Sequence, residues 1–167
     1  RGLDCPGEEL ALPAVEVLAD VARGTPPSLG DEVVVVGGGN TAMDAARTAV
    51  RLGARSVTVL YPRTKREMPC LMFEVEAAEA EGVRLDTLVA PVRLERAGEG
   101  ALRLTCVRME LGAPDSSGRP RPVPIPGSEF ELQATCVIAA IGQSVDLSPV
   151  DAAQLALSKW GIAADAK

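Results

Sequence analysis

The chain has 167 residues, of which 47% are hydrophobic, and this size and composition suit one domain with a buried core. Asp and Glu outnumber Lys and Arg by 23 to 17, and the net charge of −6 argues against binding to nucleic acid or to an anionic membrane. The absence of histidine excludes Ser-His-Asp triads, histidine bases and histidine-containing zinc sites. The four cysteines form no C-x-x-C pair, so we expect reduced, buried thiols in a cytoplasmic protein, with no metal site. The longest aliphatic run, Val33 to Val36, is far shorter than a membrane span, so we expect a soluble protein.

The first half of the chain alternates helix and strand patterns after an irregular lead-in over residues 1–12. A run of β-branched residues between Gly30 and Gly37 predicts a strand buried on both faces. In the helix that follows, Thr41 and Asp44 match a capping box, and Gly53 occupies the place of a left-handed C-terminal cap. The expected elements are a helix over 14–23, a strand over 32–36, a helix over 41–52, a strand over 56–61, a helix from about 67 to 81 and a strand over 83–88.

The second half of the sequence predicts an antiparallel meander, followed by one more strand of the first sheet. Strands are expected over 92–96, 101–110, 130–132 and 136–140, with a short helix over 148–157. In the segment from 112 to 128, 11 of 17 residues are Gly, Pro or Ser, which predicts a surface loop. Arg119 and Arg121 of this loop are interpreted as surface residues, the alternative being that they bind an anion or a partner. The predicted fold class is therefore α/β: a Rossmann-like parallel sheet with an inserted antiparallel β-meander.

The strongest chemical signal is the hexapeptide Gly37-Gly38-Gly39-Asn40-Thr41-Ala42, which fits G-x-G-x-x-A between a predicted strand and a predicted helix. Gly37 permits the tight turn, Gly39 lets the backbone approach a pyrophosphate, and Ala42 allows close packing of helix on sheet. Because the first N–H groups of a helix and its dipole attract anions, we expect a dinucleotide phosphate here. The alternative is a turn with only a structural role.

The residues after the second strand indicate which dinucleotide binds. Units that prefer NAD place an acid about 20 residues after the first glycine, but here Leu60, Tyr61 and Pro62 occupy that region. Arg63, Lys65 and Arg66 follow instead, and such cations form charge-assisted hydrogen bonds with a 2′-phosphate. NADP(H) is therefore favoured over NAD(H), the alternative being a solvated basic turn.

Several motifs together resemble the NADPH-binding domain of the glutamate synthase small subunit family, which includes dihydropyrimidine dehydrogenase and related FAD-dependent pyridine nucleotide oxidoreductases. They are VVVVGGGNTAMDAARTA at 33–49, YPRTKREMP at 61–69, DSSGR at 115–119, AIGQ at 140–143, PGE at 6–8 and WGIAAD at 160–165. Where that family commonly has two consecutive arginines after the strand-end tyrosine, this sequence has Pro62 and Arg63.

The resemblance implies two nucleotide-binding domains, one that binds FAD and one, inserted in it, that binds NADPH. Residues 1–30 would be a lead-in segment and helix from an adjoining FAD domain, 31–147 the NADPH-binding domain and 148–167 a return segment. The pyrophosphate would lie on the glycine-rich turn, the 2′-phosphate on Arg63 and Arg66 with Lys65 as a substitute, and the nicotinamide against Ala140, Ile141 and Gly142. FAD and any iron–sulfur clusters would lie elsewhere in a longer protein, and none of the four cysteines is assigned to a cluster.

The predicted function is delivery of hydride from NADPH to FAD, for onward transfer to an electron-accepting domain or subunit. Such transfer requires positioning of two cofactors and no catalytic acid or base from this chain. One alternative is an S-adenosylmethionine-dependent methyltransferase, although the acid which that ligand requires is absent from the second strand's end. The other is a non-catalytic NAD(P)-binding redox-sensing or docking domain.

Overall fold

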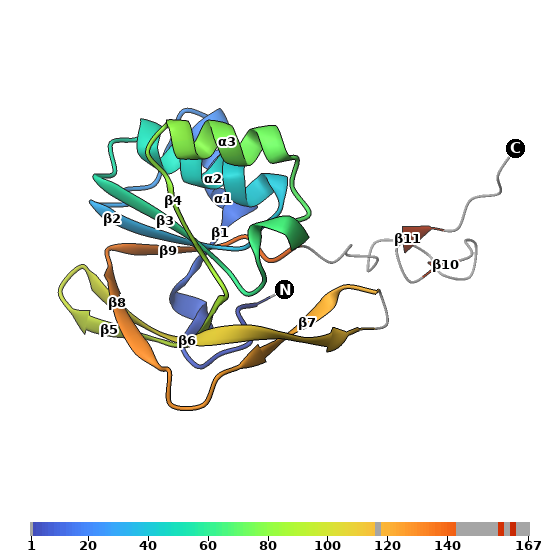
Figure 1. Cartoon of the computed structure of the whole chain (residues 1–167). Helices are drawn as coiled ribbons and strands as arrows, with labels where there is room; N and C mark the ends of the chain where they lie inside the picture. Colours follow the sequence, from blue (N-terminus) through green and yellow to red (C-terminus); the bar gives the residue numbers. More distant parts are fainter. Residues whose placement is uncertain (1, 116–117, 143–156, 159–160, 163–167) are drawn as a thin grey trace, which may run out of the picture.

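The computed structural model describes residues 2–115, 118–142, 157–158 and 161–162 (Figure 1). Five strands form a central sheet in the spatial order β1-β9-β2-β3-β4. Their bounds are Leu12–Pro13 for β1, Glu32–Val36 for β2, Ser56–Tyr61 for β3, Arg84–Thr87 for β4 and Cys136–Ala139 for β9. All neighbouring strands run parallel, which confirms the fold class predicted from the alternation of strands and helices.

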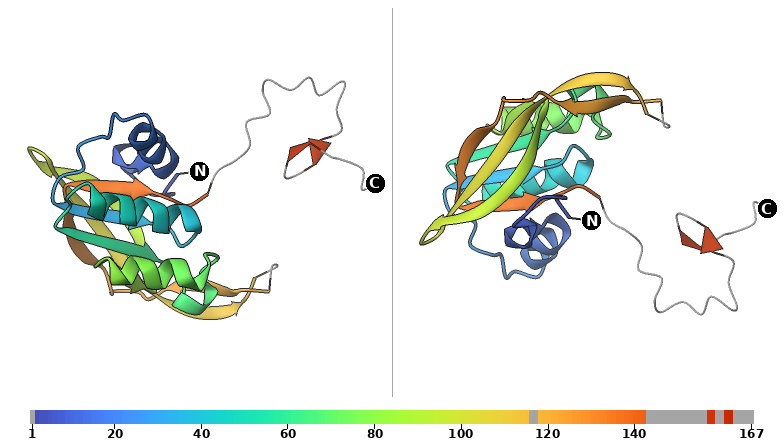
Figure 2. Two further views of the ribbon diagram at one scale, coloured as in Figure 1. Left: turned by 90° about the horizontal axis from the view of Figure 1, so that it is seen from above. Right: turned by 90° about the horizontal axis from the view of Figure 1, so that it is seen from below.

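Three helices cover one face of the parallel sheet (Figures 1 and 2). They are α1 (Ala14–Ala22), α2 (Asn40–Arg51) and α3 (Met72–Ala80), and two 3-10 turns, η1 (Glu8–Leu10) and η2 (Lys65–Glu67), lie between elements. The side of α2 that faces the core carries small residues that are fully buried: Ala42, Ala45, Ala46 and Ala49. Their small side chains let the helix axis approach the sheet closely.

An antiparallel sheet covers the opposite face, so the molecule has three layers (Figure 1). Its strands are β5 (Val89–Gly98), β6 (Ala101–Pro114), β7 (Pro120–Pro124) and β8 (Phe130–Ala134), and β6 pairs with the other three. This is the inserted antiparallel unit that the sequence predicted. A short antiparallel pair, β10 (Leu157–Ser158) and β11 (Gly161–Ile162), comes last in the chain order.

The four consecutive valines of β2 explain how one strand supports both layers. Because successive side chains of a strand point to opposite faces, Val33 and Val35 join the core under the helices, and Val34 and Val36 join the core between the sheets. All four are at most 5% exposed. The prediction of a strand buried on both faces is confirmed.

The predicted surface loop over 112–128 is wrong in its first part. β6 continues to Pro114, and β7 pairs with it in the register Met109 to Pro124 and Leu111 to Pro122. Proline suits an extended backbone, and an edge strand needs only alternate N–H groups for its single neighbour, so alternate prolines are compatible with pairing there. Prolines interrupt a central strand, but at the edge position of β7 they leave the pairing with β6 intact.

Three other boundaries also differ from the prediction. The helix expected from about 67 begins at Met72, because Met68, which precedes Pro69, is held in an extended conformation (ψ 130°). The lead-in contains η1 and β1, and β1 pairs with β9 at the edge of the parallel sheet. Residues 148–156 of the last predicted helix lie outside the described residues, and Leu157 belongs to β10.

Candidate functional site

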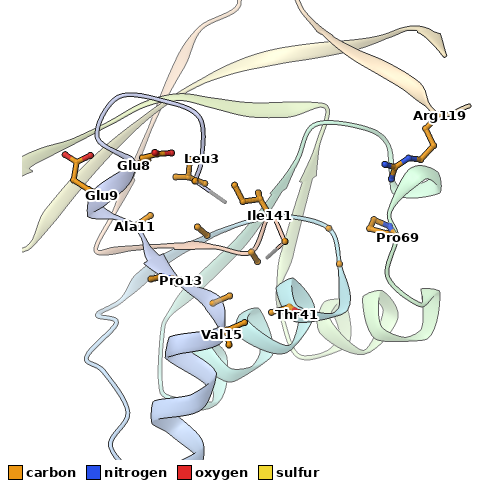
Figure 3. Close-up of a pocket in the computed structure, with 17 residues that line it drawn as sticks. Leu3, Glu8, Glu9, Ala11, Pro13, Val15, Thr41, Pro69, Arg119 and Ile141 are labelled. Atoms are coloured by element: carbon orange, nitrogen blue, oxygen red, sulfur yellow. The ribbon is translucent and has the colours of Figure 1, made fainter. Parts of the chain in front are cut away.

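A pocket of about 990 Å³ lies where β2 and β9 end at the carboxyl edge of the parallel sheet (Figure 3). Its floor combines Gly38, Gly39 and Thr41 with the segment 139–142 that follows β9. The lead-in segment, including Leu3, Glu8 and Glu9, forms one wall, and Pro69 and Arg119 form the opposite end. The carboxyl edge between neighbouring strands is the usual ligand position in open α/β sheets.

The three glycines of the turn have different structural roles. Gly37 has φ +145°, and a side chain there would meet the Ala140 carbonyl. A side chain on Gly38 would meet the ring of Tyr61 at 2.5 Å. Gly39 has an ordinary φ of −88°, and a Cβ atom there would have no atom within 4 Å from any described residue beyond its two chain neighbours. Glycine at this third position therefore serves neither backbone conformation nor packing, and leaves room for a ligand.

The start of α2 lacks the capping box predicted from Thr41 and Asp44. The N-cap is Gly39, no side chain caps it, and α2 begins at Asn40, two residues earlier than a box with Thr41 as N-cap requires. Since the first N–H groups of a helix have no partner within the helix, they remain available to an external anion. The turn thus presents backbone donors and the positive end of the α2 dipole to the pocket.

The segment after η2 is fastened directly to the glycine-rich turn. The Cys70 N–H donates to the Gly38 carbonyl (3.2 Å), and the Leu71 N–H donates to Asn40 Oδ1 (3.0 Å). The hydroxyl of Tyr61, whose ring lies under Gly38, donates to the Glu67 carbonyl (2.8 Å). Asn40, predicted as a phosphate contact, therefore uses its side-chain oxygen to hold this wall of the pocket.

The three cations predicted for the 2′-phosphate do not line the pocket. Arg63 Nε donates to the Pro120 carbonyl (2.7 Å), and its Nη2 pairs with Asp115 (3.2 Å). Lys65 pairs with Glu79 (2.7 Å), whereas Arg66 is exposed and makes no side-chain hydrogen bond or ion pair with the described residues. Within the described part of the chain, the cation that lines the pocket is Arg119, from the segment that the sequence predicted as a loop.

The residues predicted for the nicotinamide side do come together with the turn. Ala140, Ile141 and Gly142 line the pocket beside Gly38 and Gly39, and the Ala140 N–H donates to the Val36 carbonyl (2.8 Å). Gly142 has φ +92°, a conformation that favours glycine. Ala42, the last residue of the motif, is fully buried behind the turn and packs in the core under the helices.

The cysteines are all free and buried. Burial raises the pKa of Cys106 to about 12 and that of Cys136 to about 11, and it also raises the pKa of Cys5 and Cys70. The thiols are therefore protonated near neutral pH and poor nucleophiles. The described residues contain no cluster of three or more His, Cys, Asp or Glu that could hold a metal ion. Within the same part of the chain, no helix combines the length and apolar composition needed to cross a bilayer.

A family model described as pyridine nucleotide-disulphide oxidoreductase matches residues 1–167. Among curated proteins, the chain is 47% identical over 148 residues to the NADPH-Fe(3+) oxidoreductase subunit beta of Geobacter sulfurreducens, covering 87% of this chain and 22% of that protein. It is 51% identical over 141 residues to the NADP(+)-dependent formate dehydrogenase subunit beta of Moorella thermoacetica, covering 84% and 20%. The chain thus spans about a fifth of the length of these relatives.

A third curated protein and a solved structure are also similar to this chain. The glutamate synthase [NADPH] small chain of Azospirillum brasilense is 42% identical over 142 residues, which is 83% of this chain and 29% of that protein. Among solved structures, FprA of Mycobacterium tuberculosis in complex with NADPH has a TM-score of 0.72 at 18% identity, over 90% of this chain and 49% of that chain. At that identity the likeness shows the fold.

Proposed function

Because the chain belongs to the pyridine nucleotide-disulphide oxidoreductase family, we propose that it binds NADPH as one domain of an FAD-dependent oxidoreductase. The observation that carries this proposal is the open position at Gly39, where an uncapped helix N-terminus meets the pocket. A pyrophosphate fits such a site because it accepts hydrogen bonds from backbone N–H groups and needs close approach to the main chain. The relatives whose names include NADPH or NADP(+) support the choice of coenzyme.

The strand order supports one orientation of the dinucleotide across the pocket. β9 lies on one side of β2 and β3 on the other, so a pyrophosphate at residues 38–41 leaves one nucleoside beside each neighbour. We assign the nicotinamide to the β9 side, against Ala140, Ile141 and Gly142, and the adenosine to the end of β3. On that side Arg66 is exposed and is proposed as one cation for the 2′-phosphate.

The rest of the proposed reaction takes place in a longer protein. When bound, NADPH supplies a hydride for FAD, which a separate domain of the same polypeptide would hold. An electron-accepting domain or subunit, with iron–sulfur clusters, would receive the electrons. We propose residues 31–147 as the NADPH-binding domain and 148–167 as the return segment, whereas the lead-in, 1–30, also supplies a wall of the pocket through Leu3 and Glu8. This chain contributes position and electrostatics.

Calorimetric titration of the purified protein with NADPH, NADH and S-adenosylmethionine tests the coenzyme assignment. We expect NADPH to bind more tightly than NADH, and S-adenosylmethionine to give no heat of binding. No response to NADPH, or tighter binding of S-adenosylmethionine, would contradict the proposal. In the longer flavoprotein, NADPH should abolish the visible absorbance of oxidised flavin under anaerobic conditions. A flavin that stays oxidised would leave a sensing or docking role.

A further inference from the structure

The β6–β7 hairpin, an extension of the second sheet, brings a cation to the nucleotide pocket. Arg119, which immediately precedes β7, lines the pocket opposite the lead-in segment and lies beside Pro69 (Figure 3). Its carbonyl accepts a hydrogen bond from the Asp115 N–H (2.8 Å), and its own N–H donates to Asp115 Oδ1 (3.3 Å). The backbone of Arg119 is therefore fixed by Asp115.

Arg63 fastens this hairpin to the end of the parallel sheet. Its guanidinium contacts Asp115 through Nη2 and the Pro120 carbonyl through Nε, the two positions that bracket the hairpin end carrying Arg119. The Arg63 side chain is only 14% exposed, and the charge of Asp115 compensates its own. Arg63 is thus held as a structural cation, and its contacts place Arg119 at the rim of the pocket.

The position of Arg119 identifies the part of the ligand it would meet. Pro69 follows the turn after β3, the side of β2 to which the proposed function assigns the adenosine. An arginine binds a phosphate monoester more strongly than it binds a neutral hydroxyl, since it offers charged donors in a fixed fork. The ribose 2′ position is where NADPH carries such a group and NADH does not.

We propose that Arg119 binds the 2′-phosphate of the adenosine ribose, and that Arg63 is a positioning residue that holds the hairpin for it. The proposal rests on the proposed NADPH function. It adds a determinant of coenzyme choice from the antiparallel sheet to the one proposed at Arg66 in the turn after β3. Asp115 also helps to position Arg119, because it contacts both the Arg63 side chain and the Arg119 backbone.

Two adenosine probes that differ only in the 2′-phosphate test the assignment: adenosine 2′,5′-bisphosphate and adenosine 5′-monophosphate. By calorimetry on the purified protein, Arg119→Ala should weaken binding of the bisphosphate at least about tenfold and change binding of the monophosphate less than about twofold. Arg121→Ala is the matched control, since Arg121 is exposed in β7 and does not line the pocket, and should change neither affinity. Equal losses for both probes with Arg119→Ala, or none, would overturn the assignment.

The role of Arg63 is tested by a double-mutant cycle with the same probes. Arg63→Ala should reduce affinity for the bisphosphate in the parent protein but cause little further loss in the Arg119→Ala background, because Arg63 acts through Arg119. Additive losses would mean that Arg63 contacts the phosphate itself, which overturns its positioning role. A parent protein that binds neither NADPH nor either probe would contradict the proposed function itself, whereas binding that ignores Arg119 contradicts only this inference.

Discussion

Of the three consecutive glycines after β2, Gly38 is required for packing, whereas Gly39 is open to a ligand. Gly38 packs against the buried ring of Tyr61, whereas Gly39 faces open space in the pocket. The same substitution at the two positions should therefore have opposite consequences. Gly38→Ala forces the ring or the turn to move, and overpacking of this kind typically costs about 1–3 kcal/mol.

We expect Gly39→Ala to keep the fold and to weaken NADPH binding. Its φ of −88° suits alanine, and the loss of a glycine N-cap costs at most about 1 kcal/mol. The new methyl group would occupy the space that a pyrophosphate needs, so affinity should fall at least about tenfold. Thermal unfolding and calorimetric titration of both variants check this, with Gly38→Ala as the destabilised comparison. Unchanged NADPH affinity in Gly39→Ala would show that no ligand approaches this backbone.

The buried thiols predict a loss of stability at alkaline pH. Burial raises the pKa of Cys106 from 9.0 to about 12, so in the unfolded chain this thiol ionises at a lower pH than in the folded protein. Its contribution is fully present below pH 9 and declines between pH 9 and about 12, by up to roughly 1.4 kcal/mol per pH unit. Urea unfolding from pH 7.5 to 10.5 should show a shallower decline for Cys106→Ala than for the parent. Identical slopes would contradict the assignment of this pH dependence to Cys106.

At the scale of elements, an ion-pair network joins α2 to α3. Arg47 of α2 contacts Glu74 (2.9 Å) and Glu81 (2.8 Å), and Arg51 also contacts Glu81 (2.7 Å). A solvated acidic face is the simplest interpretation of this helix from its sequence. Among the described residues Glu76 makes no ion pair, but Glu74 and Glu81 pair with α2, and Glu79 pairs with Lys65 of η2. Helix spacing alone does not reveal partners that lie about 30 residues away in the chain.

Glu81→Gln should lower the melting temperature at pH 7 and lower it less at pH 3. Hydrogen bonds from Arg51 and Arg47 hold the pKa of Glu81 below its ordinary value of 4.5. The stabilising contribution is therefore present above pH 4.5 and is lost as the pH falls through the lowered folded-state value. Glu76→Gln, an exposed change in α3, the helix whose C-cap is Glu81, serves as the control in thermal melts at both pH values. A difference that is as large at pH 3 as at pH 7 would rule out the ionic explanation.

Local sequence patterns do not reveal contacts between residues far apart in the chain, and this explains which parts of the site the sequence predicted. The glycine-rich turn and the segment after β9 were predicted because each follows a buried strand, and parallel strands bring their carboxyl ends to one edge. The place of Arg119 was missed because it depends on β7 pairing with β6 and on Arg63, 57 residues before Pro120. Local patterns predict elements, whereas a contact between a loop of one sheet and a hairpin of another requires the tertiary structure.

At the scale of the whole molecule, the two sheets share one core. Leu60 of β3 and Val137 of β9 belong to the same buried cluster as Leu94 and Leu104 of the antiparallel sheet. The parallel sheet thus has helices on one face and strands on the other, and neither sheet buries its inner face alone. We infer that the two sheets unfold as one cooperative unit, so that the hairpin carrying Arg119 depends on the stability of both.

Leu104→Ala tests this coupling, because Leu104 is fully buried in β6 between the two sheets. Removing its side chain should lower the free energy of unfolding by about 2–5 kcal/mol. Native-state hydrogen exchange should then show equal losses of protection in β6 and in β2, whose Val34 and Val36 face the same cluster. Val75→Ala, on the helix side of the sheet, provides the reverse comparison and should reduce protection in β6 as well as β2. Loss of protection confined to β5–β8 in Leu104→Ala would mean that the parallel sheet keeps its structure without the antiparallel one, and that the hairpin is a separable attachment.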